Sequence, residues 1–121
     1  DKEMLLQMKQ EVDDVFVSDK LFAYVAALAK ATREHTYIEL GLSPRGSIAC
    51  VRMAKAWAYL KGRDYVLPED VSDIFMDVAK HRIVLSTKAR VAHVAVTAVL
   101  EEILVKVKQP ASYMREEEYR V

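Results

Sequence analysis

The sequence has 121 residues, which is enough for one domain and short for two. Apolar residues make up 52% of it, so a core can be built, while 18 basic and 18 acidic residues give a formal net charge of zero. This balance argues against a general nucleic-acid-binding domain, which usually carries a basic excess. Only three glycines and three prolines are present, which favours long helices over many turns.

The single cysteine, Cys50, excludes an internal disulfide and fits a reducing compartment. No run approaches the ~18 apolar residues that a membrane-spanning helix needs. The chain begins with Asp1 rather than Met, as we expect of a piece of a longer protein.

The first predicted helix has a weak signal in the sequence, and the second has a strong one. Residues 1–10 predict a short helix or a frayed lead-in, and residues 11–18 an extended connector. A longer helix begins near Ser18 and Asp19, both good capping residues, and runs to about Glu34. Its buried face is expected to hold the side chains at helical spacing, Leu21, Phe22, Val25, Leu28, Ala29 and Thr32.

The second long helix begins at Ser43 and Pro44 and runs to about Lys61, with Gly62 at its C-terminal end. It is apolar on nearly every side except at Arg52 and Lys55. A helix of this kind is expected to be central, with neighbours on several faces.

Two further helices are predicted after it. One begins at Pro68, carries acidic residues in its first turn and ends before the cations of residues 80–82. The other is capped by Ser86 and runs from about Lys88 to Val107, because its polar residues recur every three or four positions. The fold class is therefore all-α, a small bundle of about four main helices with little or no strand. Residues 1–17 are expected to form a connector, 18–108 the helical domain and 109–121 a polar tail.

The chain lacks the residues of a self-sufficient catalyst. No GxxxxGK[ST] loop is present to hold nucleotide phosphates. His35, His81 and His93 are scattered, and no His/Cys spacing predicts a metal site. We therefore expect no catalysis from this chain alone.

Arg45 is the unusual residue, because it places a cation in the first turn of the second helix. The positive end of the helix dipole disfavours a cation there by about 0.3–1 kcal/mol. An anion in front of the helix would remove that cost, since free amides and an arginine fork both bind phosphate. Arg52 and Lys55 follow on the same side of the helix and extend a basic stripe. Arg45 could instead extend into water or pair with Asp64, Glu69 or Asp70.

A longer stretch, GLSPRGSIACVRMAKAWAYLKGRDYVLPEDV, resembles the C-terminal helical lid of MoxR-type AAA+ ATPases. The matching pieces are residues 41–46, residues 62–71, His81-Arg82-Ile83 and Leu85-Ser86, and residues 17–34 resemble the first lid helix. The likeness covers roughly residues 11–105. Leu42 and Gly46 stand where the family often has alanine. Leu67 replaces a threonine, so the third helix loses a side-chain cap.

The resemblance implies that Arg45 is the sensor-2 arginine, which reaches the phosphates of ATP, with Ser43 and Arg52 beside it. The ATP and its magnesium would be held by an N-terminal ATPase module of the same polypeptide. The parent protein would be a cytoplasmic ATPase, active as a ring, commonly a hexamer in this family, with a chaperone-like role in maturing or assembling other proteins. Proteins with von Willebrand factor A domains would be partners.

Two other functions fit the residues alone. One is a free-standing helical adaptor that binds a protein partner and has no nucleotide role. A GxxxxGK[ST] motif elsewhere in the parent gene would separate it from the ATPase lid. The other is a small helical DNA-binding domain that uses the basic stripe, which the zero net charge disfavours.

Overall fold

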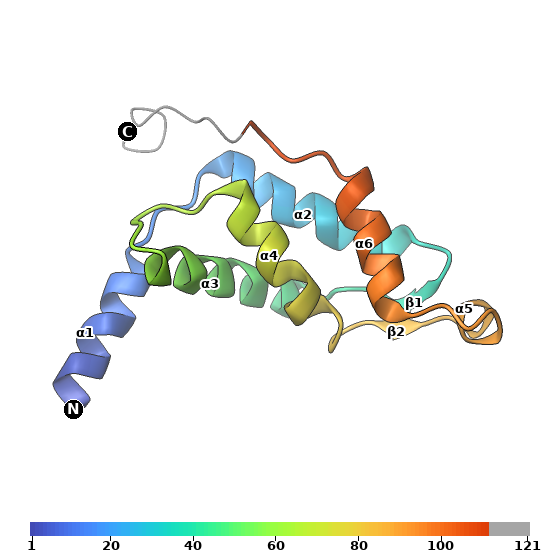
Figure 1. Cartoon of the computed structure of the whole chain (residues 1–121), viewed down its shortest axis with the longest axis horizontal. Helices are drawn as coiled ribbons and strands as arrows, with labels where there is room; N and C mark the ends of the chain where they lie inside the picture. Colours follow the sequence, from blue (N-terminus) through green and yellow to red (C-terminus); the bar gives the residue numbers. More distant parts are fainter. Residues whose placement is uncertain (112–121) are drawn as a thin grey trace.

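The computed structural model describes residues 1–111, in which short strands accompany a helical bundle. The helices are α1 Lys2–Asp13, α2 Asp19–Glu34, α3 Pro44–Leu60, α4 Pro68–Ala79, α5 Thr87–Val91 and α6 Val96–Lys106, and the strands are β1 Ile38–Leu40 and β2 Val84–Leu85. The predicted all-α class with little strand is confirmed. Helices α2, α3, α4 and α6 form the bundle, while α1 projects from one end and α5 lies at the other (Figure 1). The part of the predicted tail from residue 112 onward lies outside the described residues.

The starts of α2 and α3 follow the predicted capping pattern. The Ser18 hydroxyl accepts a hydrogen bond from the Leu21 amide at 3.3 Å, and the Ser43 hydroxyl accepts one from the Gly46 amide at 3.2 Å. Each bond satisfies an amide that the helix itself leaves free. Both helices therefore begin where the sequence predicts.

The core lies between α2, α3, α4 and α6. Its fully buried side chains include Leu21, Leu28, Leu42, Phe75, Leu100 and Ile103. The prediction for α2 was wrong at one position, because Phe22 is 48% exposed while Tyr24 is buried. Helix α2 contacts α4 and α6 as well as α3, so its buried arc is rotated toward Tyr24.

Helix α3 is less enclosed than its composition predicts. Only its stripe of small residues is buried, namely Gly46, Cys50, Ala54 and Ala58. Large apolar side chains on its other sides, among them Met53 and Leu60, are exposed. The predicted neighbours on several faces are present, since α3 contacts α1, α2 and α4. The expected burial of most of its sides was wrong, because α3 packs on α4 through small side chains and leaves its outer face open.

The predicted helix from Lys88 to Val107 was also wrong, because it is two helices. Helix α5 ends at Val91, and His93 adopts a positive φ of 56°. The Val94 amide then donates to the Ala89 carbonyl at 3.0 Å, as in a helix-ending left-handed turn. The chain reverses there and returns as α6 to cover α2 and α4.

The first connection also differs from the prediction, since residues 11–13 belong to α1 rather than to an extended segment. Beyond Asp14 the chain is extended, and Phe16 forms a parallel bridge with Tyr65. The Phe16 amide donates to the Asp64 carbonyl, and the Val66 amide donates to the Phe16 carbonyl, both at 2.9 Å. The segment between α1 and α2 is thereby fixed to the loop between α3 and α4.

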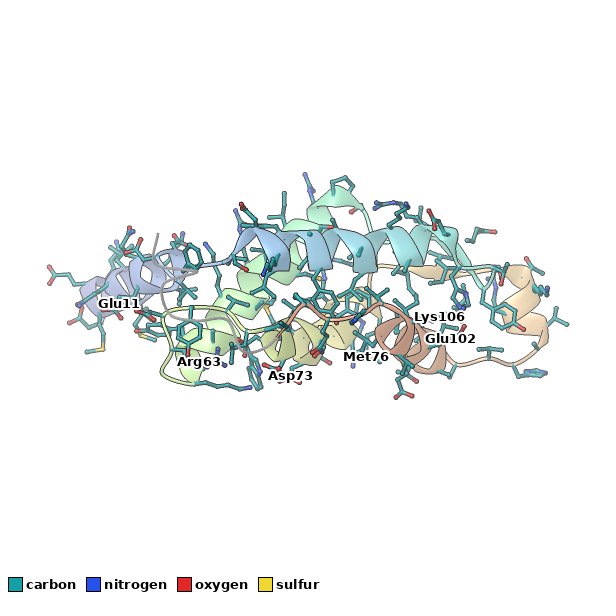
Figure 2. All side chains as sticks on the ribbon, turned by 90° about the horizontal axis from the view of Figure 1, so that it is seen from above. Glu11, Arg63, Asp73, Met76, Glu102 and Lys106 are labelled. Carbon is teal, nitrogen blue, oxygen red and sulfur yellow. The ribbon has the colours of Figure 1, made fainter. Side chains whose placement is uncertain are left out.

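That loop is held by a buried ion pair. Arg63 donates two hydrogen bonds of 2.7 Å to the Asp70 carboxylate, which is fully buried in the first turn of α4. Asp70 also accepts a hydrogen bond from the Leu67 amide at 2.7 Å. This bond stabilises the start of α4, where the Leu67 side chain cannot act as a cap. Figure 2 places Arg63 near Glu11 at the α1 end of the molecule, with Glu102 and Lys106 on α6 toward the other end.

The two strands form an antiparallel pair beside the start of α3. Ile38 pairs with Leu85 and Leu40 with Val84, with an irregularity between them. Ile38 is buried and its neighbours are exposed, so the strands cover one edge of the bundle. The pair sets the path of the loop that leads into α3.

Candidate functional site

Arg45 lies in the first turn of α3 with an exposed side chain. Among residues 1–111 its guanidinium has no ion-pair or hydrogen-bond partner. The candidate partners on its own domain are otherwise placed, since Asp70 is occupied by Arg63 and neither Asp64 nor Glu69 pairs with Arg45. The cation is therefore free to meet a group from outside the described chain.

The backbone at this helix start leaves one donor beside Arg45. Pro44 has no N–H, and the amides of Gly46 and Ser47 are bonded to Ser43 at 3.2 and 3.0 Å. The Arg45 amide remains available in the first turn. Ser43, which the resemblance places at the ligand, uses its hydroxyl oxygen as the helix cap.

The loop before Arg45 is fixed to the end of α2. The Leu42 amide donates to the Thr32 hydroxyl at 2.8 Å, and that hydroxyl donates to the Ala29 carbonyl at 2.6 Å. Arg33 donates to the Leu42 carbonyl at 2.8 Å. Both polar groups of Leu42 are thus bonded to α2, which holds the helix start and Arg45 in place.

Two glycines permit this close packing. A Cβ on Gly41 would lie 2.7–2.8 Å from atoms of Arg33, two of them backbone atoms. A Cβ on Gly46 would lie 2.4 Å from a methyl group of Leu42, which is fully buried. Gly46 therefore provides a close approach at the helix start, and the departure from alanine at 46 accompanies the departure to leucine at 42.

Arg52 and Lys55 continue along α3, as the sequence predicts, but have different surroundings. Both line an open groove of about 1020 Å³ between α1, α2 and α3. The Lys55 ammonium donates to the Asp13 carbonyl of α1 at 3.0 Å, whereas the Arg52 side chain is exposed. Lys55 thus fixes α1, and Arg52 is the cation of this pair that is open to a ligand.

The sequence analysis missed residues that position Arg45. Thr32 was predicted only as a side chain of the buried face of α2, and Arg33 only as part of the stretch 17–34 that resembles the first lid helix. Arg82 was read as a helix-end cation, yet its Cδ lies 3.4 Å from where a Gly46 Cβ would be. Its guanidinium donates to the Val78 carbonyl at 3.4 Å. Thr32 and Arg33 lie ten and nine residues before Leu42, a separation that gives no periodic signal, so only the bonds themselves identify these roles.

The surroundings of the site are apolar on the buried side. Burial raises the pKa of the Cys50 thiol to about 11, so Cys50 is a protonated core side chain at neutral pH. Within residues 1–111 no cluster of three His, Cys, Asp or Glu side chains is placed to hold a metal ion. The helices of this part of the chain also include none with the length and apolar character needed to cross a membrane.

Comparison with known proteins shows which family this chain is similar to. The family model described as the AAA lid domain matches residues 30–103. A Bacillus subtilis protein, YeaC, is 36% identical over 90% of this chain, and the Mycobacterium tuberculosis chaperone MoxR1 is 31% identical over 88% of it. The crystal structure of a candidate ATPase from Cytophaga hutchinsonii superposes with a TM-score of 0.85 at 34% identity over 91% of the chain. The chain therefore belongs to the AAA lid domain family, as a lid of the MoxR-type AAA+ ATPases.

The chain spans about a third of each of these relatives. It covers 34% of YeaC, 30% of MoxR1 and 36% of the Cytophaga hutchinsonii protein. The relatives thus carry about two-thirds of their residues outside the part that corresponds to this lid.

Proposed function

We propose that this chain is the lid through which a MoxR-type AAA+ ATPase detects bound ATP, with Arg45 as the sensor-2 arginine. The observation that supports this proposal is a fixed backbone that presents, at a helix N-terminus, an exposed guanidinium with no partner among residues 1–111. Such a group gains most from an anion, because the helix dipole and the guanidinium then act on it together. ATP supplies that anion.

Each of the three predicted site residues has a separate role in this proposal. Arg45 binds the terminal phosphate and stabilises the negative charge that builds up on it in the transition state of hydrolysis. Ser43 shapes the helix start, and Arg52 lies two turns along the same helix to contact the nucleotide or a neighbouring subunit. Magnesium, held by the ATPase module, supplies charge neutralisation between the phosphates.

At the level of the parent protein, the lid couples the state of the nucleotide to the angle between it and the ATPase module. Neighbouring subunits in a ring would transmit that change to other proteins, in the chaperone role that the name of the mycobacterial relative suggests. We place the parent protein in the cytoplasm, with proteins carrying von Willebrand factor A domains among its partners.

The test is ATP turnover by the full-length parent protein carrying Arg45→Ala. Turnover should fall by about 10- to 1000-fold, since one charged transition-state donor is lost. Arg90→Ala is the matched control, because Arg90 is also an exposed arginine but lies on α5. Turnover of the Arg45 variant within twofold of the control would refute the sensor role. A parent gene without a GxxxxGK[ST] motif would leave the adaptor function instead.

A further inference from the structure

The segment from residue 78 to residue 100 contains no acidic residue, although the whole chain carries 18 acidic and 18 basic residues. Four of the basic residues fall within this segment, namely Lys80, Arg82, Lys88 and Arg90. The segment runs from the end of α4 through β2 and α5 into α6. Figure 1 shows β2 and α5 toward the end of the molecule opposite α1. Positive charge is therefore concentrated in one region of a chain that is neutral as a whole.

Three of these cations have no counter-charge within the part of the chain that the structure describes. Lys80 forms an ion pair with Asp77 at 3.4 Å. In that described part, Arg82, Lys88 and Arg90 form no ion pair, and all three are exposed. Carboxylates of a partner would therefore meet cations that no acidic side chain of the described residues occupies.

Exposed apolar side chains accompany these cations. Leu40 and Val84 are cross-strand partners in the β1–β2 pair and are 60% and 41% exposed. Val91, the last residue of α5, is 73% exposed. The Lys88 ammonium lies 6.0 Å from the centre of the Tyr37 ring, so the α5 cation is close to the start of β1. We call this end of the molecule the basic end, and define it by the exposed residues Leu40, Arg82, Val84, Lys88, Arg90 and Val91.

The backbone of the basic end is fixed by hydrogen bonds. The Ser86 hydroxyl caps α5 by accepting from the Ala89 amide at 3.2 Å, and Ala89 is fully buried. The Ser86 amide donates to the Tyr37 carbonyl at 2.9 Å, which joins the start of α5 to the segment before β1. The left-handed turn at His93 closes the other end of α5. A surface with a fixed backbone loses less entropy when a partner binds than a flexible one does.

The two kinds of exposed side chain together indicate what the basic end binds. Its three cations attract an acidic partner, and Glu39 is the one acidic residue of β1, β2 and α5. Nucleic-acid phosphates would leave the apolar groups unused, and a chain that binds many phosphates usually has a basic excess that this one lacks. Protein interfaces, in contrast, combine an apolar centre with a polar rim. The observations therefore favour a protein partner.

We propose that the basic end is a docking surface for a second protein, distinct from the parent ATPase, through an apolar patch flanked by carboxylates. The carboxylates pair with the three cations, and the apolar patch covers the three exposed apolar side chains. This surface lies outside the groove between α1, α2 and α3 and includes neither Arg45 nor Arg52. The inference therefore does not depend on contact between Arg45 and ATP.

Two probe peptides test this surface on the full-length parent protein. One is a short fluorescein-labelled peptide of alternating aspartate and leucine, and the other has serine in place of leucine. Fluorescence anisotropy at low salt measures the binding of each peptide. The leucine peptide should bind about tenfold more tightly than the serine peptide, because only its side chains remove the exposed apolar groups from water.

Charge reversal distinguishes the basic end from other surfaces of the protein. Lys88→Glu with Arg90→Glu should weaken binding of the leucine peptide by about tenfold or more, since two of the three cations become anions. The matched control is Lys106→Glu with Lys108→Glu, which reverses two exposed cations at the C-terminal end of α6 and should change binding less than twofold. Val91→Ser should weaken binding of the leucine peptide alone. Circular dichroism checks that each variant is folded.

Equal binding by the charge-reversed and control variants would overturn the proposal, as would equal binding of the two peptides or no binding of the leucine peptide. Tighter binding of duplex DNA than of the leucine peptide would also overturn it, and would assign the basic end to nucleic acid. Dissociation of the oligomer in the charge-reversed variant would overturn it in favour of a neighbouring subunit.

The docking surface and the sensor role can fail separately. Arg45→Ala should leave binding of the leucine peptide unchanged, because Arg45 lies outside the basic end. The Lys88→Glu and Arg90→Glu variant should keep ATP turnover within twofold of that of the parent protein. Lost turnover in this variant would contradict a docking surface that is independent of the ATP site.

Discussion

Leu42 and Gly46 share one space at the start of α3. The Leu42 side chain is fully buried, and a Cβ on Gly46 would lie 2.4 Å from its nearest methyl group. The larger residue at 42 is accommodated because the smaller one stands at 46. The position of the loop that carries Arg45 depends on this pair.

The pair should therefore be coupled in stability. Gly46→Ala should lower the free energy of unfolding by about 1 kcal/mol, since overpacking outweighs the gain in helix propensity. Leu42→Ala should lower it by about 2–4 kcal/mol. The double variant should lose at least about 1 kcal/mol less than the sum, because the new methyl group enters the space that leucine leaves. Urea unfolding followed by circular dichroism measures all four proteins, and strict additivity would contradict the shared space.

Thr32 should be needed for the loop rather than for α2. Thr32→Val keeps the shape of the side chain but leaves the Leu42 amide without its acceptor. The free energy of unfolding should fall by about 1–3 kcal/mol, the cost of an unsatisfied buried donor. Thr32→Ser retains the hydroxyl and is the matched control. A valine variant as stable as the serine variant would show that the hydrogen bond contributes nothing.

Asp70 should be the most sensitive charged residue of the bundle. Asp70→Asn disrupts the paired hydrogen bonds to Arg63 and should cost about 3 kcal/mol, because the partly buried Arg63 cation loses its counter-charge. Asp73→Asn is the control, since Asp73 is an exposed partner of Lys61 on the same helix. Its loss should stay below about 1 kcal/mol. Chemical unfolding of both variants decides the matter, and equal losses would contradict a special role for the Arg63 pair.

Cys50 should make the fold weaker at alkaline pH. Its folded pKa of about 11 lies above the ordinary 9.0, so the protonated thiol is favoured by folding. That contribution is complete below pH 9 and is lost as the pH rises toward 11, because the unfolded chain releases the proton first. Cys50→Ala should flatten the fall of the free energy of unfolding over this range. Rapid labelling of Cys50 by a thiol reagent at pH 8 without denaturant would show that the thiol is not buried.

Replacing His93 with glycine should stabilise the fold. Its φ of 56° is costly for a side chain with a Cβ, by roughly 1 kcal/mol. His93→Gly should therefore raise the free energy of unfolding by about 0.5 kcal/mol, after the entropy that glycine loses on folding. His93→Val should lower it by more than about 1 kcal/mol, because branched side chains fit this conformation worst. Thermal unfolding compares the three, and a valine variant as stable as the glycine variant would contradict the left-handed turn.

The local signals in the sequence were sufficient where capping and periodicity act within one segment. Ser18, Ser43 and Pro68 define the starts of α2, α3 and α4, because a helix cap is formed by residues within three positions. The placement of Arg45 in a first turn followed from the same rule. The likeness to MoxR-type lids also came from contiguous residues, and the comparisons confirm it.

The tertiary structure decided what depends on distant partners. The break at His93, the exposed outer face of α3 and the rotation of α2 toward Tyr24 all follow from which helices lie against which, and periodicity within one segment carries no such information. The same holds for Arg45: its first-turn position was predicted from the sequence, but only the fold shows that residues 1–111 offer it no partner and that Asp70 pairs with Arg63 beyond the opposite end of α3. Interactions within a few residues determine where helices begin. Which side chains share a space or a hydrogen-bond partner is determined only when distant segments pack together.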